Sequence, residues 1–366
     1  MTNENQNIPV MSVTGVVELL ARQYTNAIKK NIPFKNVETP FLWGPAGVGK
    51  SQGVFQLAQK LEKTTGRRVV VTDVRLYLYT PVDLHGIPVA DAAREFTTWL
   101  RPKIFDMDPG PDVINILFLD EMSSAPPAVQ AAAYQLTLDR AVGQHTLPEN
   151  CIVIAAGNRT SDMGISFKMA KPLCNRMKHF SVRADYDSWR RWAVINGIDS
   201  RVVGYLGFDS SRLASEPGVS DLAFPTPRSW QFVSMDLQLN ECEPSQIHEL
   251  ISAGIGIDAA LDFENWCKVF QDLPLVDSIL NGTCRTYPKR QDVLYALFAS
   301  LTATLRDRAQ TLTERELENA CAYASRFPKD FVMAFFTDLN ALEPLWLKLM
   351  KCPSVKVWLS ENKKYL

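Results

Sequence analysis

The segment from residue 39 to residue 61, TPFLWGPAGVGKSQGVFQLAQKL, contains three patterns in direct succession. A short apolar run at 41–43 predicts a buried strand, and apolar residues at helical spacing over 54–61 predict a helix. Between them the pattern G-x-x-x-x-G-K-[ST] is filled by Gly44, Gly49, Lys50 and Ser51. The segment therefore predicts a phosphate-binding loop between a strand and a helix.

The residue types in this loop suit a bound triphosphate. A triphosphate needs several N–H donors at short range, and glycines allow the backbone to curl its amides inward. The N-terminus of the following helix adds partial positive charge at the same place. Lys50 can reach the β- and γ-phosphates, and the Ser51 hydroxyl can bind Mg²⁺. We expect the nucleotide to contact Gly44, Pro45, Ala46, Gly47, Val48, Gly49, Lys50 and Ser51.

An acidic pair follows a second apolar run, ILFL at 116–119, which predicts a strand ending at Asp120 and Glu121. Ligands of α/β proteins bind at the carboxyl edge of the sheet, where both acids would project. Hydrolysis of a nucleotide needs one carboxylate for the metal shell and a second group to orient water. We assign Asp120 to Mg²⁺ and Glu121 to the water. The alternative is a strand that leaves the core through two solvated acids.

A third strand is predicted at 151–156, CIVIAA, and Asn158 follows it after one glycine. An amide side chain at a neighbouring strand end can hydrogen-bond both the γ-phosphate and the attacking water. We therefore include Asn158 among the catalytic residues. Taken alone, an asparagine after Gly157 is more typical of a turn than of a catalytic site.

The alternation of strands and helices up to about residue 185 predicts an α/β domain, 1–185, with a parallel sheet. Hairpins are expected near 80–105 and 138–150, and residues 1–11 are expected to be a loose lead-in. Ser124 is the expected N-cap of the helix that follows the acidic pair. From 186 onward the patterns are mainly helical.

Composition limits the possible classes of function. The 366 residues are 46% hydrophobic and 22% charged, as in an ordinary soluble protein, and the net charge is −1. No bulk positive field favours nucleic acid or an acidic membrane. The seven cysteines show no C-x-x-C spacing, which favours reduced thiols over a disulfide framework or a zinc site. With no signal-peptide pattern and no apolar run long enough to span a bilayer, we expect a cytoplasmic protein.

The chain resembles an AAA+ ATPase in the order and spacing of three motifs, GPAGVGKS, ILFLDE and IVIAAGN. More narrowly, it resembles the MoxR-like branch, which is associated with von Willebrand factor A proteins. The segment TPVDLHG at 80–86 resembles what precedes that branch's extra hairpin. LCNRM at 173–177 resembles the element with the arginine finger, although the family usually has Phe where Met177 stands. PTPRSW at 225–230 resembles the motif that opens a lid helix. The resemblance covers about 12–300.

The resemblance implies a ring, usually a hexamer, with ATP bound at subunit interfaces. Arg176 would enter the neighbouring subunit's site as the finger, and Arg228 would contact nucleotide from a lid. It implies a helical lid at 186–300, followed by a C-terminal helical extension at 301–366. Hydrolysis of ATP to ADP and phosphate would then move subunits against one another and remodel a protein partner, with a von Willebrand factor A protein as one candidate.

Two alternatives stay open at the level of sequence. The related fold also serves motors or loaders that act on nucleic acid, which the net charge of −1 and the lack of a basic stripe make the weaker prediction. A nucleotide-gated assembly factor for a large complex would differ from a remodelling ATPase only in its partner.

Overall fold

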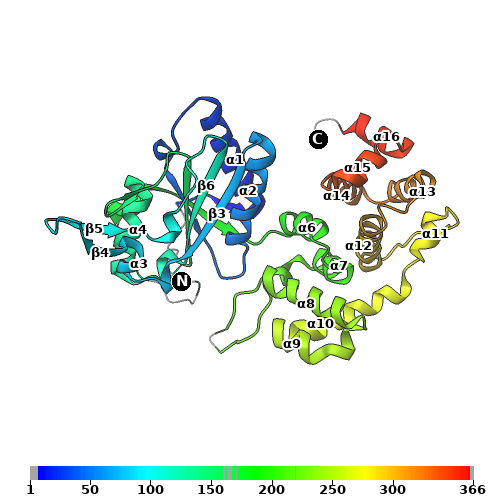
Figure 1. The fold of residues 1–366 in the computed structure, drawn as a ribbon. Coiled ribbons are helices and arrows are strands. Elements are labelled where there is room, and N and C mark those ends of the chain that lie inside the picture. The colour runs from blue at the N-terminus through cyan, green and yellow to red at the C-terminus, as the bar shows by residue number, and fades with distance from the viewer. Residues whose placement is uncertain are drawn as a thin grey trace. The chain divides into compact units, whose positions relative to one another are not determined.

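A computed structural model describes residues 7–159, 162, 167, 169, 171–218 and 220–362, without the side chains of residues 172 and 173. The chain divides into two compact units, which meet between Ala184 and Asp185 and are described separately below. The first is an α/β unit and the second, over its described residues, contains helices and no strands (Figure 1). The predicted fold class, a parallel-sheet core followed by a mainly helical region, is confirmed.

The first unit is built on a six-stranded sheet in the order β1-β10-β2-β9-β6-β3, and every neighbouring pair is parallel. The neighbouring strands β6 and β9 are buried along their whole length, which explains why their sequences are mostly apolar. The strands are β1 (Val10–Ser12), β2 (Thr39–Trp43), β3 (Arg68–Arg75), β6 (Val113–Asp120), β9 (Cys151–Gly157) and β10 (Met177–Arg183).

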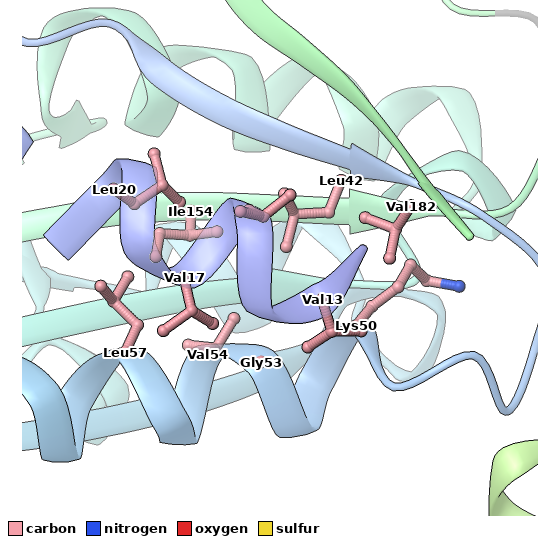
Figure 2. A pocket seen from close by; sticks show the side chains of 11 residues that line it. Val13, Val17, Leu20, Leu42, Lys50, Gly53, Val54, Leu57, Ile154 and Val182 are labelled. Carbon is pink, nitrogen blue, oxygen red and sulfur yellow. The ribbon is translucent and has the colours of Figure 1, made fainter. Parts of the chain in front are cut away.

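Two helices, α1 (Val13–Lys29) and α2 (Lys50–Thr65), cover one face of this sheet. Figure 2 shows Val17 and Leu20 of α1 and Val54 and Leu57 of α2 meeting Ile154 of the sheet. This packing holds α2, and with it the end of the predicted loop, against the central strands.

The other face is covered by α4 (Pro127–Asp139) and the short helix α3 (Pro81–His85). Two antiparallel ladders stand apart from the main sheet. They are formed by β4 (Ile87–Ala90) with β5 (Thr97–Leu100), and by β7 (Ala141–Val142) with β8 (His145–Thr146). The remaining helix of this unit is α5 (Lys171–Cys174).

The second unit packs its helices around buried aromatic side chains such as Trp230, Phe263 and Phe335. Its subdivision at residue 300 stays a prediction. The helices are α6 (Tyr186–Ile195), α7 (Ser200–Phe208), α8 (Pro227–Asn240), α9 (His248–Ile255), α10 (Ile257–Cys267), α11 (Val276–Leu280), α12 (Gln291–Asp307), α13 (Glu314–Ala324), α14 (Lys329–Asn340), α15 (Glu343–Leu349) and α16 (Pro353–Glu361). None of the helices in the described part of the chain is long and apolar enough to cross a membrane.

Two local expectations were wrong. Residues 10–12 form a strand, β1, which adds to the edge of the sheet beside β10. Ser124 does not cap α4; it ends a short 3-10 helix, and Pro126 occupies the N-cap position with Pro127 at the first helical residue. Proline is favoured at that first position because its missing N–H has no helical partner there, so the double proline displaced the start of the helix.

Candidate functional site

The predicted loop connects β2 directly to α2. Gly47 and Gly49 have φ of 76° and 102°, in the left-handed region that only glycine enters at little cost. A Cβ on Gly44 would lie 2.6 Å from the Val182 carbonyl oxygen, so the loop begins where only glycine fits. Because the N-cap of α2 is Gly49, no side chain there accepts from the first amides of the helix. Those amides suit an external anion.

Lys50 is 8% exposed, and its ammonium group is surrounded by oxygen. It donates to the main-chain oxygens of Gly44 at 2.5 Å and Pro45 at 3.0 Å, and to Asn158 Oδ1 at 2.8 Å. Figure 2 shows the aliphatic part of Lys50 beside Val13 and its nitrogen pointing away from the apolar side chains. The positive charge is therefore held over the loop by a buried stem.

Ser51 and Asp120 meet at the carboxyl edge of the sheet. The Ser51 hydroxyl donates to Asp120 Oδ2 at 2.8 Å, and Asp120 Oδ1 accepts from the Glu121 amide at 2.8 Å. A hydroxyl and a carboxylate oxygen at one point suit Mg²⁺, which prefers oxygen ligands and takes few from the protein when phosphate supplies the others. The described residues contain no cluster of three or more His, Cys, Asp or Glu side chains that could hold a metal unaided.

Glu121 adopts a left-handed backbone conformation, with φ 55° and ψ 31°. This conformation is uncommon for a non-glycine residue, costs of order 1 kcal/mol or more, and is concentrated at functional sites. Its carboxylate Oε2 accepts from Asn158 Nδ2 at 3.3 Å and from the Ser124 hydroxyl at 3.2 Å. The strained turn thus directs the carboxylate toward the end of β9.

Asn158 links the lysine and the glutamate. Strand β9 lies between β2 and β6 in the sheet, so the residue after it lies between the loop and the acidic pair. Its Oδ1 accepts from Lys50 while its Nδ2 donates to Glu121, and the residue is 9% exposed. The structure therefore brings together Lys50, Ser51, Asp120, Glu121 and Asn158 at one edge of the sheet.

Sequence reasoning missed a third carboxylate, Asp73 on β3, the neighbour of β6. Burial raises the pKa of Asp73, the negative charge of Asp120 raises it further, and Arg75 opposes both effects. A cation beside Asp73 and Asp120 would favour the ionised form of Asp73. The available signal was the parallel pairing of β3 with β6, which places Arg75 opposite Asp120.

The two predicted arginines are exposed. Arg176 lies in the turn between α5 and β10, and Arg228 lies in the first turn of α8, which belongs to the second unit. Both positions leave the guanidinium accessible. Their assignment to a finger and to a lid contact stays a prediction.

No family model matches the chain, and no curated protein matches it. Solved structures do show a likeness. The match to PCH-2 from C. elegans covers 71% of this chain and 69% of the PCH-2 chain, with 15% identity and a TM-score of 0.35. The match to a RuvB variant from Thermotoga maritima covers 79% of this chain and 83% of the RuvB chain, with 15% identity and a TM-score of 0.34. The match to NtrX from Brucella abortus covers 87% of this chain and 67% of the NtrX chain, with 12% identity and a TM-score of 0.32. Scores and identities this low say nothing of what the chain binds or does.

Proposed function

We propose that the chain binds ATP with Mg²⁺ and hydrolyses it to ADP and phosphate. One observation supports this most directly: Asn158 hydrogen-bonds both Lys50 of the glycine loop and Glu121 of the acidic pair. In this proposal Lys50 binds phosphate and Glu121 orients the attacking water, and a residue that contacts both suits a role at the γ-phosphate.

Binding would use the loop and the first turn of α2. The loop amides would donate to phosphate oxygens, and Lys50 would exchange a main-chain oxygen of Gly44 or Pro45 for a phosphate oxygen. The exchange costs little free energy of desolvation, because the Lys50 ammonium group has oxygen partners both before and after the nucleotide binds. Ser51 and Asp120 would hold Mg²⁺, which neutralises charge on the phosphates.

Catalysis would use the residues at the ends of β6 and β9. Glu121 would accept a hydrogen bond from the attacking water and draw its proton away, and Asn158 would fix the line of attack from the opposite side. Glu121 lies beside Asp120 in sequence, so the metal ligand and the water-directing carboxylate share one rigid strand end.

We further propose that the chain is an AAA+ ATPase that forms a ring, on the model of a hexamer, and remodels or activates a protein partner. Support comes from the motif resemblance and from the exposed position of Arg176, which a neighbouring subunit could receive. In this proposal Arg176 stabilises charge on the transferred phosphoryl group across the interface, and Arg228 couples the lid to nucleotide. A von Willebrand factor A partner rests on the sequence resemblance alone.

The test is phosphate release by purified full-length protein at several protein concentrations. If active sites form between subunits, the rate per subunit rises with concentration, depends on Mg²⁺, and follows the mass of the assembly measured by light scattering. Full activity in dilute monomer would contradict the shared site, and absence of Mg²⁺-ATP binding would contradict the function altogether. Stimulation by DNA that weakens with salt would favour a nucleic-acid motor instead.

A further inference from the structure

Ser123, which sequence reasoning did not single out, is fully buried and hydrogen-bonds the main chain of Asn158 in both directions. Its hydroxyl accepts from the Asn158 amide at 2.9 Å and donates to the Asn158 carbonyl at 2.9 Å. One side chain thus satisfies both polar main-chain groups of the residue that touches Lys50 and Glu121. Because one hydroxyl is bonded to both of these groups, it fixes the position of that residue.

The surroundings leave this serine little freedom. A Cβ on Gly157 would lie 2.6 Å from Ser123 Oγ, so the glycine before Asn158 is what allows the hydroxyl to approach. The Ser123 carbonyl accepts from the Phe167 amide at 2.7 Å and from Gln130 Nε2 at 3.4 Å. Tyr134 in turn donates to Gln130 Oε1 at 3.1 Å. A buried polar network with satisfied members is rigid.

We propose that Ser123 is a positioning residue for catalysis, which joins the end of β6 to the end of β9 and so fixes Asn158 relative to Glu121. The inference rests on the proposed ATPase function and adds a residue to that site. Ser123 follows Glu121 by two residues, so the turn that directs the glutamate also carries the hydroxyl that holds the asparagine. The side chains of Glu121 and Asn158, which would both contact the attacking water, are then held in a fixed relative position.

The first test is Ser123→Ala in the full chain. We expect the ATP dissociation constant to change by less than about threefold, because the loop keeps its phosphate donors. We expect kcat to fall about 10-fold, because Asn158 loses both of the hydrogen bonds by which Ser123 fixes its main chain. The matched control is Tyr134→Phe, which removes a hydrogen bond from the same buried network without touching Asn158.

Two outcomes would overturn the proposal. If Tyr134→Phe lowers kcat as much as Ser123→Ala at an equal loss of thermal stability, the serine is only structural. If Ser123→Ala lowers kcat by the same factor in an Asn158→Ala background as in the natural chain, it does not act through Asn158; we expect less than about twofold there. Failure of the function itself is seen separately, because the natural chain would then release no phosphate.

Discussion

Asn158 Nδ2 lies 3.3 Å from Glu121 Oε2, and the two residues directly follow neighbouring parallel strands, β9 and β6. The same asparagine accepts from Lys50 through its other side-chain atom at 2.8 Å. An amide side chain can donate to a carboxylate through its nitrogen and accept from an ammonium group through its oxygen at the same time. The relationship therefore sets the order of charges across the site, from cation through amide to anion.

Glu121→Gln should retain ATP binding and lose turnover by about 10² or more, because glutamine keeps the shape but cannot accept the proton from water. Nucleotide affinity by fluorescence titration and phosphate release on the same sample measure both effects. The matched control is Glu62→Gln on α2, a carboxylate of the same unit outside the site. Normal hydrolysis by Glu121→Gln would remove Glu121 from the mechanism.

Lys50→Ala should abolish measurable nucleotide binding, since it removes the charge that the loop holds at its centre. Lys60→Ala is the matched control, because Lys60 lies on the same helix, its side chain is 40% exposed, and it pairs with Glu18. Titration with a fluorescent ATP analogue distinguishes the two variants. Equal affinity of Lys50→Ala and the natural chain would mean that the nucleotide is bound elsewhere.

Arg176→Ala should bind ATP but hydrolyse it at least about 10³-fold more slowly, as expected when a finger arginine is lost. Mixing it with Glu121→Gln subunits should restore activity to about a quarter of the natural rate, because random assembly pairs an intact Glu121 with an intact Arg176 at that frequency. Lys178→Ala, a nearby exposed cation paired with Glu38, controls for loss of surface charge. A mixture that stays inactive would argue against a shared site.

The free energy of unfolding of the helical unit should depend on pH through Asp338. This residue is fully buried, its Oδ2 lies 2.9 Å from Arg190 Nε, and burial raises its pKa to about 6 against the opposing charge of Arg190. The folded-state pKa lies above the unfolded value, so the stability contributed by the protonated form is complete below about pH 4. It is lost as pH rises to about 6, by on the order of 3 kcal/mol.

Chemical denaturation of the natural chain and Asp338→Asn between pH 4 and pH 7 tests this dependence on pH. The difference in the free energy of unfolding should shift in favour of the variant as pH rises to about 6, and then remain constant. Asp187→Asn is the control, because Asp187 is exposed and pairs with the same arginine at 3.2 Å. A difference that does not depend on pH would show that Asp338 is ionised throughout.

The loop and the acidic pair were predictable because each depends on a local pattern that ends at a strand terminus. Parallel strands bring their carboxyl ends to one edge, so Lys50, Asp120 and Asn158 could be placed together without knowledge of the packing. Ser123 could not be found in this way. Its role depends on a hydroxyl that meets a strand 35 residues later, and nothing in its local sequence distinguishes it from Ser124.

The N-terminal strand was missed for a related reason. Three residues are too short for periodicity to identify, and β1 exists because β10 offers it an edge. Ser124 shows the opposite error, since a good capping residue was outweighed by the two prolines that follow and by its hydrogen bond to Glu121. In each case a partner distant in sequence, or a competing local constraint, decided the outcome.

Strand β10 is the last element of the first unit, and it lies between β1 and β2. The chain leaves β10 only two residues before Asp185, the first residue of the second unit. Tension applied at Asp185 along the direction of β10 would therefore load that strand in shear, against hydrogen bonds to β1 and β2 on both sides. Because Gly44 packs against the Val182 carbonyl, the same tension would reach the start of the glycine loop directly.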